Sequence, residues 1–457
     1  MDSTLGMLSI VLAAGEGKRM HSKRPKVLHE VCGIPMVEHV CNCAKAAGAE
    51  EVVVVIGHCA DEVKGKLQGV NFVLQETQQG TGHAVLQADS YIDDRLVLVL
   101  CGDIPLLRAE TLQDMYKEHI KLGNHATVLT AEFKDPFGYG RIVKDASGNI
   151  ISIVEERDAS TEQKLIKEIN SGIYLFRGEL LKSAIKKIDN NNAQREYYLT
   201  DVIRMLNDGD YKVGAYKIDD HNEIMGVNNR YQLTKAEKIM RERILREHML
   251  LGVTIIDPNN TYIDPSVRIE KDVTILPGCI IKGDTYIRED ACIGPFSRII
   301  DSDIGKGVEV QNSVVLKSSI GEGTRIGPFA YLRPGNTIGK KVRIGDFVEI
   351  KNSTLGDNTK ASHLAYIGDG DIGTNVNLGC GVVFVNYDGK EKHRVTIEDG
   401  SFVGCNVNLI APVNLGTNSY IAAGTTVTED VPGKALAIGR AKQDNKEGWV
   451  ERKGLLK

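Results

Sequence analysis

The sequence predicts two domains of different class joined by a helix. Residues 1–228 should form an α/β domain with Rossmann-like organisation, residues 229–252 a linker helix, and residues 253–457 an all-β parallel β-helix of hexapeptide repeats. Three observations support this prediction. Apolar segments alternate with helical stretches in the first half, a charged segment without Gly or Pro follows, and an aliphatic residue recurs at every sixth position in the second half.

Short apolar segments in the first half predict the strands of a mostly parallel sheet, with helical stretches such as Gly82–Tyr91 between them. The predicted strands are Leu8–Leu12, Val52–Ile56, Phe72–Leu74, Leu96–Leu100, Ala126–Thr130, Ile173–Phe176 and Val213–Tyr216. Ligands of open α/β sheets bind at the carboxyl ends of the strands. The loops that follow these strands are therefore the candidate binding loops.

The linker is predicted as one long helix because its apolar residues form a rough helical stripe among many charges. The stripe consists of Tyr231, Leu233, Ala236, Met240, Ile244 and Met249. Asn228 or Asn229 can cap the start of this helix, and Gly252 can end it.

The six-residue period predicts a parallel β-helix from about Val253 to about Pro432, in which each short strand places one aliphatic side chain inside. The periodic residues are Ile263, Ile269, Ile275, Ile281, Ile287, Ile293, Ile299, Ile304, Val310, Ile320, Ile326, Leu332, Ile338, Ile344, Ile350, Val403, Leu409, Leu415, Ile421 and Val427. Gly, Asn or Asp often follows and suits the turns. A polar insertion between Val383 and Phe402 predicts a loop on one face, which in solenoids is often the binding face.

The bulk composition argues against several classes of protein. The formal net charge is -5, with 56 basic and 61 acidic residues well mixed, which disfavours nucleic acid or an anionic membrane as the main partner. We expect no membrane span, because no apolar run approaches about 18 residues, and no secretory signal, because the segment Leu8–Ala14 is short. Nine scattered cysteines without a CxxC motif indicate reduced thiols in a cytoplasm, with neither a disulfide framework nor a zinc site.

A glycine-rich turn, Gly15-Glu16-Gly17, follows the first predicted strand and could present backbone N–H groups to phosphates. It is neither a dinucleotide fingerprint, since Met20 replaces the third Gly, nor a P-loop, since Arg19 follows Lys18. A plain tight turn is the alternative interpretation. Arg19 and Lys26 lie just beyond the turn, where both could reach a triphosphate.

Asp103 follows the predicted strand Leu96–Leu100 and should therefore lie at the carboxyl end of the sheet. A carboxylate there suits Mg²⁺ shared with phosphate oxygens. The alternative is that Asp103 caps a helix that begins at Pro105.

Two cations of the β-helix, Arg333 and Lys351, are separated by 18 residues, or three hexads. If one coil takes three hexads, these cations stack on neighbouring coils, which is costly unless an anion lies between them. This spacing predicts a phosphate site. His363 is out of phase with the pair because Thr354-Leu355 introduces a five-residue step.

Several motifs resemble those of sugar-nucleotide pyrophosphorylases. They are residues 12–20 (LAAGEGKRM), 25–28 (PKVL), Gln75, 80–84 (GTGHA), 102–106 (GDIPL), 138–142 (GYGRI), 170–172 (NSG) and 226–230 (GVNNR). Together with the hexads, they make the whole chain similar to the bacterial GlmU family of bifunctional N-acetylglucosamine-1-phosphate uridylyltransferases and glucosamine-1-phosphate acetyltransferases. The resemblance implies a nucleotidyltransferase domain, a left-handed β-helix, a cytoplasmic homotrimer, and a product, UDP-N-acetylglucosamine, that feeds peptidoglycan and lipopolysaccharide synthesis.

For the first domain, the resemblance implies that UTP and Mg²⁺ are bound and that Arg19 and Lys26 act in catalysis by neutralising the triphosphate. The implied contacts of UTP and UDP-N-acetylglucosamine are Leu12, Ala13, Ala14, Gly15, Lys26, Gln75, Gly80, Thr81, Gly140, Glu155, Asn170 and Asn228. Asp103 and Asn228 would ligate the metal. Lys18 departs from the Thr that is usual in the family.

For the β-helix, the resemblance implies that His363 is the general base and that Glu349 orients it. Glucosamine-1-phosphate would be bound by Arg333, Lys351, Tyr366 and Asn377. Acetyl-CoA would be contacted by Asn386, Tyr387, Lys392, Cys380, Cys405, Ala423 and Arg440, with Asn386 also close to the sugar. Cys380 and Cys405 stand where relatives often have Ala and Ser, and we interpret Cys405 as a packing variant because direct acetyl transfer needs no nucleophilic thiol.

Two other functions remain open at this point. The chain could be a nucleotidylyltransferase whose β-helix serves only to form oligomers, but a scaffold needs neither His363 nor the loop Asn386–Arg394. It could also be a β-helix binding scaffold with a degenerate α/β domain, but Arg19, Lys26 and Asp103 are all present.

Overall fold

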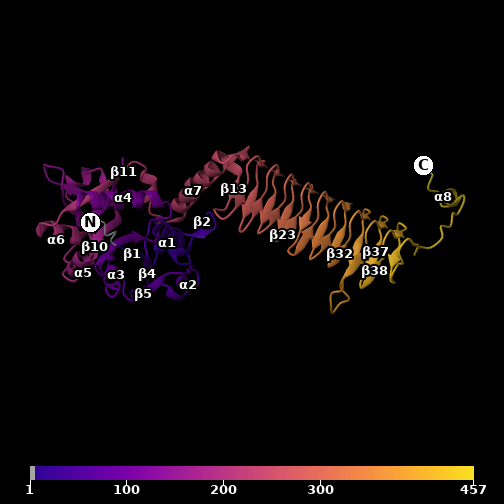
Figure 1. Cartoon of the computed structure of the whole chain (residues 1–457), viewed down its shortest axis with the longest axis horizontal. Helices are drawn as coiled ribbons and strands as arrows, with labels where there is room; N and C mark the ends of the chain where they lie inside the picture. The colour runs from indigo at the N-terminus through magenta and orange to yellow at the C-terminus, as the bar shows by residue number, and fades with distance from the viewer. Residues whose placement is uncertain (1–5, 457) are drawn as a thin grey trace. The chain divides into compact units, whose positions relative to one another are not determined.

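The computed structural model describes residues 6–456, and the chain divides after Met240 into two compact units. The division falls within α7 (Arg230–Leu250), so that one helix contributes to both units (Figure 1). Among the described residues, no helix is long and apolar enough to cross a membrane.

The first unit is built on one nine-stranded sheet with the order β11-β7-β10-β6-β1-β4-β5 and with β8 and β9 paired beside β10. Its strands are β1 (Met7–Leu12), β4 (Glu51–Ile56), β5 (Asn71–Leu74), β6 (Leu96–Cys101), β7 (Ala126–Glu132), β8 (Arg141–Lys144), β9 (Ile150–Val154), β10 (Glu168–Arg177) and β11 (Val213–Ile218), with a separate pair β2 (Glu30–Val31) and β3 (Ile34–Pro35). Its helices before α7 are α1 (Met36–Ala46), α2 (Ala60–Lys64), α3 (Thr81–Leu86), α4 (Ala109–Leu122), α5 (Gly178–Ile185) and α6 (Thr200–Asp208), with short 3-10 turns η1 (Lys18–Met20), η2 (Lys26–Leu28), η3 (Gln163–Leu165) and η4 (His221–Ile224).

Every strand predicted for this unit is present, and the sheet is mostly parallel with β10 antiparallel to β6 and β7. The prediction Ile173–Phe176 covers only the end of β10, because the register shifts between Asn170 and Tyr174 and polar residues break the apolar pattern there. Strands β8 and β9 were not predicted, since each mixes buried with exposed residues. Helix α3 is shorter than the predicted Gly82–Tyr91, because tighter turns follow Leu86.

Alternating side chains of the central strands fill a separate core on each face of the sheet. On β1, Met7 and Val11 belong to the core that contains residues of α1 and α4. Leu8 and Ile10 belong to the opposite core, which contains residues of α3, α5 and α6. This two-sided burial explains why the parallel strands are continuous apolar runs.

The long helix α7 confirms the prediction of a linker helix, and Asn229 is its cap because its Oδ1 accepts a hydrogen bond from the N–H of Gln232 at 2.9 Å. Gly252 follows the helix with a positive φ of 96°, as expected of a terminating glycine. The predicted apolar stripe is only partly buried. Ala236 and Ile244 are buried, whereas Tyr231 is 81% exposed.

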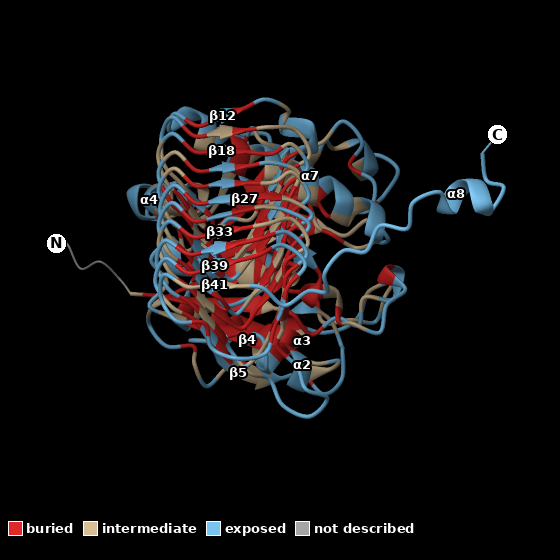
Figure 2. Cartoon of the chain, turned by 90° about the vertical axis from the view of Figure 1, so that its right-hand side faces the viewer, coloured by how far each residue is buried: buried red, intermediate tan, exposed pale blue. Residues whose placement is uncertain are grey.

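The second unit is a parallel β-helix with three long sheets, and the fold class is the one expected (Figures 1 and 2). We call the sheets faces 1, 2 and 3. Face 1 contains β12 (Thr254–Ile255), β15 (Thr274–Ile275), β18 (Cys292–Ile293), β21 (Glu309–Val310), β24 (Arg325–Ile326), β27 (Arg343–Asp346), β30 (Lys360–His363), β33 (Asn377–Leu378), β36 (Phe402–Val403), β39 (Tyr420–Ile421) and β41 (Leu436–Ala437). Face 2 contains β13 (Tyr262–Ile263), β16 (Ile280–Lys282), β19 (Arg298–Ile300), β22 (Val314–Leu316), β25 (Tyr331–Leu332), β28 (Glu349–Lys351), β31 (Tyr366–Gly368), β34 (Val383–Val385), β37 (Asn408–Ile410) and β40 (Thr426–Val427). Face 3 contains β14 (Arg268–Ile269), β17 (Tyr286–Ile287), β20 (Asp303–Ile304), β23 (Ser318–Ile320), β26 (Asn336–Ile338), β29 (Thr354–Leu355), β32 (Gly370–Ile372), β35 (Val395–Ile397) and β38 (Val413–Leu415).

Each strand pairs with the third strand before and after it, so one coil takes three strands, as the hexads predicted. The periodic aliphatic side chains are buried inside the coils, which Figure 2 shows as a stack of buried segments. The repeat also continues between Ile350 and Val403, although a strict spacing of six residues did not predict its aliphatic residues there. There Leu355 and Ile372 are buried inner residues that arrive after five-residue steps.

Short elements complete the second unit. The turn η5 (Pro258–Asn260) lies in the first coil, and the short helix α8 (Trp449–Arg452) lies in the tail after Gly439, for which no element was predicted. The polar insertion forms the loop between β34 and β35.

Candidate functional sites

A cavity of about 270 Å³ opens at the carboxyl ends of β1 and β6 in the first unit. The predicted residues that line it are Leu12, Ala13, Ala14, Gly15, Lys26, Gln75, Gly80, Thr81 and Asp103. Val27, Gln78, Ala84, Cys101 and Glu196 also line it and were not predicted. Glu196 comes from a loop 93 residues beyond Asp103, the nearest of the other lining residues in sequence, and no local pattern marks it.

The glycine-rich turn packs directly on Lys26. Gly17 has a positive φ of 67°, and a Cβ on it would lie 2.5 Å from Cβ of Lys26, so a larger residue would collide with the lysine stem. Arg19 lies on η1 with an exposed side chain. Lys18 is also exposed and forms an ion pair with Glu16 at 3.1 Å. Close packing against Lys26 therefore requires a glycine at position 17, whether or not the turn also binds phosphates.

Lys26 connects the two predicted metal ligands. Its Nζ donates to Oδ2 of Asp103 at 2.6 Å and to Oδ1 of Asn228 at 3.2 Å. Asn228 is brought there because the N–H of Val227 donates to the carbonyl oxygen of Asp103 at 2.9 Å. Asp103 is not a helix cap, since α4 begins only at Ala109. Two hard oxygen donors thus converge on one position that a cation occupies.

This donor set fits Mg²⁺, which proteins commonly hold through one or two side-chain oxygens together with substrate phosphates. Within residues 6–456, no group of three or more His, Cys, Asp or Glu side chains is placed to hold a metal ion. A complete protein cage is therefore absent from the described part of the chain, and a metal at Asp103 and Asn228 would need ligand oxygens as well.

Gln75 is a buried polar residue at the wall of the cavity. Its Nε2 donates to the carbonyl oxygen of Gly80 at 3.2 Å and lies 2.9 Å from Nδ1 of His83. Gly80 has a positive φ of 110°, and a Cβ there would lie 2.6 Å from the carbonyl oxygen of Tyr197. This packing fixes the amide plane of Gln75 against the cavity.

Three further predicted residues, Gly140, Glu155 and Asn170, form a second group. The N–H of Asn170 donates to the carbonyl oxygen of Gly140 at 2.9 Å, and a Cβ on Gly140 would lie 3.5 Å from Oε1 of Glu155. Burial raises the pKa of the Glu155 carboxyl, and Asp158 adds to the shift. Burial also raises the pKa of the Cys101 thiol to about 12, which makes Cys101 a packing residue rather than a nucleophile.

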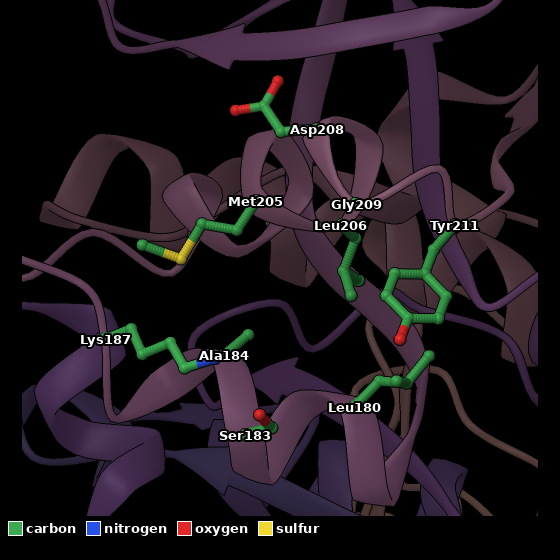
Figure 3. A pocket seen from close by; sticks show the side chains of 9 residues that line it. All are labelled: Leu180, Ser183, Ala184, Lys187, Met205, Leu206, Asp208, Gly209 and Tyr211. Atoms are coloured by element: carbon green, nitrogen blue, oxygen red, sulfur yellow. The ribbon is translucent and has the colours of Figure 1, made fainter.

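A separate cavity of about 390 Å³ lies between α5 and the region of α6, as Figure 3 shows. It is lined by Leu180, Ser183, Ala184, Lys187, Met205, Leu206, Asp208, Gly209 and Tyr211. None of the predicted site residues lines it.

In the β-helix, predicted residues align along the corner between faces 1 and 2. The strand register pairs Asp346 with His363, and the pairs Ala361–Leu378, Leu378–Val403 and Val403–Ile421 continue this alignment downward. On each of these coils, the residue two positions after the buried strand residue therefore lies above or below its counterpart on the next coil. We call this line the corner ladder, and its members are Asp346, His363, Cys380, Cys405 and Ala423. Arg440 joins it, since its Nη1 donates to the carbonyl oxygen of Ala423 at 2.7 Å.

Asp346, rather than Glu349, is the hydrogen-bond partner of His363. Oδ1 of Asp346 lies 2.6 Å from Nδ1 of His363. This hydrogen bond is the main cause that lowers the pKa of the Asp346 carboxyl. Glu349 instead accepts from Nη1 of Arg333 at 3.0 Å, so the structure does not support the expected orienting role of Glu349.

The cation pair of the phosphate prediction lies on face 2. Leu332 pairs with Ile350, which places Arg333 beside Lys351 on the next coil. Carboxylates already accompany both cations: Glu349 contacts Arg333, and Oδ2 of Asp369 lies 3.9 Å from Nζ of Lys351. The stacking was predicted correctly, but side-chain carboxylates offset the repulsion without any ligand.

A third cation, Lys392, comes from the loop between β34 and β35. The neighbouring Lys351 ammonium lowers the pKa of Lys392. Close cations of this kind favour an anion. Asn386, from the same loop, donates to Oδ2 of Asp369 at 2.5 Å.

Gly368 makes room for this cluster. A Cβ there would lie 2.5 Å from the hydroxyl oxygen of Tyr366 and 2.7 Å from Nδ2 of Asn386. Tyr366, Asn386, Lys351 and Lys392 are therefore neighbours on face 2. Tyr387, in contrast, is 55% exposed and donates its hydroxyl to the carbonyl oxygen of Gly389 at 2.7 Å.

Asn377 is the predicted residue that the fold separates from this cluster. It lies on face 1, where it pairs with Lys360 and Phe402. Tyr366 lies on face 2, across the corner. Side chains that point outward from different faces of one β-helix diverge, so one copy of the chain does not bring Asn377 and Tyr366 to the same ligand.

Comparisons with known proteins agree with both halves. The family model of the MobA-like NTP transferase domain matches residues 9–170, and that of the bacterial transferase hexapeptide (six repeats) matches residues 317–352. The chain is 55% identical over 454 residues to the bifunctional protein GlmU of Acetivibrio thermocellus, covering 99% of this chain and 98% of the relative. It is 55% identical to that of Alkaliphilus oremlandii, covering 98% and 99%, and 52% identical to that of Clostridioides difficile, covering 97% of each chain.

Proposed function

Because the chain belongs to the GlmU family of bifunctional proteins, we propose that its two units catalyse consecutive reactions. The β-helix transfers an acetyl group from acetyl-CoA to glucosamine-1-phosphate. The first unit then transfers uridylyl from UTP to N-acetylglucosamine-1-phosphate and releases pyrophosphate. The observation that carries the proposal is that each unit has its own convergent pair of functional side chains, Lys26 with Asp103 in the first and Asp346 with His363 in the second.

In uridylyl transfer, the sugar phosphate attacks the α-phosphorus of UTP in line, and pyrophosphate leaves. Such chemistry depends on positioning and charge neutralisation rather than on a protein nucleophile. Arg19 and Lys26 would neutralise the triphosphate, and Lys26 would exchange its contact with Asp103 for one with phosphate oxygens. Asp103 and Asn228 would hold Mg²⁺, which supplies further charge neutralisation at the phosphates.

Nucleobase and sugar would be held at opposite ends of this site. Since Nε2 of Gln75 donates to the carbonyl oxygen of Gly80, its Oε1 would accept from the uracil N3–H. The backbone of Ala14, Gly15 and Thr81 would contact the uracil and the ribose. Gly140, Glu155 and Asn170 would hold the N-acetylglucosamine.

In acetyl transfer, Nε2 of His363 would accept a proton from the sugar amine as the nitrogen attacks the thioester carbon. Asp346 would accept a hydrogen bond from Nδ1–H, which presents Nε2 as the unprotonated nitrogen and stabilises the imidazolium that forms. The imidazolium then returns the proton to the departing thiolate of CoA. The phosphate of glucosamine-1-phosphate would bind the cations Arg333, Lys351 and Lys392.

The acetyl-CoA would lie along the corner ladder below His363. Cys380, Cys405 and Ala423 follow one another there, and Arg440 stands at Ala423 with a cation suited to a phosphate of the cofactor. A cofactor in this position points its thioester up the ladder toward His363.

We further propose that the protein is a homotrimer. Four apolar side chains next to the ladder are exposed by more than half: Phe296 at 70%, Phe329 at 56%, Phe347 at 58% and Leu364 at 57%. All four have positive φ values and stand at the corner of faces 1 and 2, and Phe329 stacks on Phe347 with ring centroids 5.5 Å apart. We call them the apolar ridge. Phe329, Phe347 and Leu364 follow one another on consecutive coils, whereas Asn312 separates Phe296 from them. Such an apolar patch favours contact with another copy, and a neighbour that brings its Asn377 to this corner would reunite the residues that one copy separates.

The proposed location is the cytoplasm, where UTP and acetyl-CoA are present and thiols are kept reduced. All nine cysteines are free thiols in the structure.

Two substitutions test the assignment of one reaction to each unit. Asp103→Asn should abolish uridylyl transfer and leave acetyl transfer intact, and His363→Ala should do the reverse. Acetyl transfer is measured as thiol release and uridylyl transfer as pyrophosphate release. If His363→Ala released thiol at the normal rate, the β-helix would be a scaffold or use another base.

A further inference from the structure

Two thiols occupy neighbouring rungs of the corner ladder. Leu378 pairs with Val403, and Cys380 and Cys405 each follow two residues later. The N–H of Gly379 donates to the carbonyl oxygen of Val403 at 2.8 Å, and the N–H of Asn406 donates to that of Cys380 at 2.7 Å. The two cysteines are therefore in register on adjacent coils, although the loop between β34 and β35 separates them in sequence.

The spacing of adjacent coils suits a disulfide. Neighbouring parallel strands lie about 4.8 Å apart, and a disulfide spans Cα atoms about 4.4–6.8 Å apart. Within the described residues of the β-helix, the other two cysteines, Cys279 and Cys292, are not in register with each other, because Cys292 pairs with Thr274 and Glu309 and Cys279 precedes β16.

Both thiols are accessible. Cys405 is exposed and Cys380 is half-buried, whereas burial raises the pKa of Cys41, Cys43 and Cys101 to about 12. A corner that admits acetyl-CoA also admits a small oxidant, so this pair is chemically distinct from the structural thiols of the first unit.

We propose that Cys380 and Cys405 are a redox pair whose disulfide stops acetyl transfer; the effect on activity rests on the function proposed for the ladder. A peroxide would oxidise the exposed Cys405 to a sulfenic acid and leave as an alcohol or water. The Cys380 thiol would then attack that sulfur, forming the S–S bond and releasing water. Two thiols and one peroxide thus give one disulfide, and a reducing thiol restores the pair by exchange.

The position explains the expected effect. Cys380 is the rung directly below His363, and Cys405 is the next rung. An S–S bond there would draw both sulfurs together on the surface along which the thioester must reach the imidazole. The first unit has no part in this change, so uridylyl transfer is an internal control in the same chain.

The experiment uses the full-length protein. It is treated with hydrogen peroxide, free thiols are blocked, and peptides are mapped without reduction while both activities are assayed before and after dithiothreitol. We expect a Cys380–Cys405 linked peptide, loss of acetyl transfer of at least tenfold, unchanged uridylyl transfer, and recovery with dithiothreitol.

Variants are compared with their own reduced state. Cys405→Ser should keep the same acetyl transfer rate after peroxide as before it, whereas Cys292→Ser, which alters a thiol away from the ladder, should remain as sensitive as the original chain. Absence of the linked peptide would overturn the proposal, as would a linked but fully active enzyme. If the reduced protein shows no acetyl transfer at all, the proposed function fails, whereas the linked peptide alone decides whether the pair forms.

Discussion

Asp346 and His363 stand at matching positions on neighbouring coils, and Oδ1 of the carboxylate lies 2.6 Å from Nδ1 of the imidazole. Because this hydrogen bond is the main cause that lowers the pKa of Asp346, the carboxylate is ionised throughout the neutral range. It therefore selects the tautomer that leaves Nε2 free to accept a proton.

The first prediction is that Asp346→Asn slows acetyl transfer through kcat. Removing the carboxylate loses both the tautomer selection and the stabilisation of the imidazolium, which in other His–carboxylate pairs reduces kcat by factors of up to about 10⁴. We expect a decrease of at least about tenfold, with KM for glucosamine-1-phosphate little changed and uridylyl transfer intact. Steady-state kinetics with separate thiol and pyrophosphate assays checks this.

Glu349→Gln is the matched comparison, since Glu349 contacts Arg333 and not His363. It should alter mainly KM for glucosamine-1-phosphate. The opposite pattern, with kcat lost in Glu349→Gln and kept in Asp346→Asn, would return the orienting role to Glu349.

The second prediction concerns the cation that Asp103 and Asn228 share. Since Nζ of Lys26 occupies the position between them, it competes with a divalent metal in the absence of nucleotide. Lys26→Met should therefore bind Mn²⁺ more tightly, by about tenfold, which is about 1.4 kcal/mol, when measured by electron paramagnetic resonance without nucleotide. Its uridylyl transfer should nevertheless fall, because the triphosphate loses a cation.

Lys18→Met is the control for overall charge, because Lys18 is exposed and paired with Glu16. Its Mn²⁺ affinity should equal that of the original chain. Equal affinities in all three proteins would mean that the metal does not bind at Asp103 and Asn228.

The third prediction concerns assembly. Replacing the stacked pair of the apolar ridge, Phe329 and Phe347, by Glu should separate the proposed trimer into monomers, because two charges would be buried without partners at the proposed interface. Acetyl transfer should then be lost while uridylyl transfer persists. Sedimentation velocity gives the oligomeric state.

Phe137→Glu, a change of a 77% exposed aromatic in the first unit, should leave the assembly unchanged. A trimeric double variant would place the interface elsewhere.

The fourth prediction is a pH dependence of stability in the first unit. Burial lowers the pKa of His119 from 6.5 to about 4, and its Nδ1 hydrogen bonds with Thr127 at 2.8 Å. Below pH 6.5 the unfolded chain binds a proton that the folded chain excludes, so the free energy of unfolding falls as the pH falls from 6.5 toward 4. The loss for this one group reaches about 3 kcal/mol.

Pulse proteolysis of the first unit across a urea series, at pH 7 and pH 5, measures this dependence. His119→Asn should be less stable at pH 7 but lose less stability on acidification. His58→Asn, a change at an exposed residue, should follow the original chain. An unchanged pH dependence in His119→Asn would assign the effect to other groups.

The sequence predicted the architecture well because both halves depend on simple periodic burial. The continuous apolar run Leu96–Leu100 fills the cores on both faces of the sheet, and the repeated aliphatic residues around Ile326 fill the interior of the coils. Residues within the sequence motifs, such as Gly80 and Asp103, were also predicted as site residues, and both line the same cavity.

The partners of these residues were harder to predict because they depend on register. His363 faces Asp346 because one coil between them holds 17 residues, after the five-residue step to Leu355. A strict count of three hexads would place the residue 18 positions earlier, Gly345, opposite the histidine. A second five-residue step, to Ile372, brings Cys380 below His363, and only the paired strands of the structure show it.

Contacts between distant segments were beyond any local pattern. Lys26 meets Asp103 and Asn228 from three separate loops, and Glu196 reaches the nucleotide cavity from a fourth. Likewise, the separation of Asn377 from Tyr366 follows from the faces to which they belong.

A coupled assay of the purified protein tests the central claim most directly. Glucosamine-1-phosphate, acetyl-CoA, UTP and Mg²⁺ are supplied together, and free thiol and pyrophosphate are followed separately. Two consecutive activities in one chain predict that both are released and that pyrophosphate appears only after acetylation. Pyrophosphate from supplied N-acetylglucosamine-1-phosphate, without any thiol release from acetyl-CoA, would contradict the account and leave the β-helix as a scaffold.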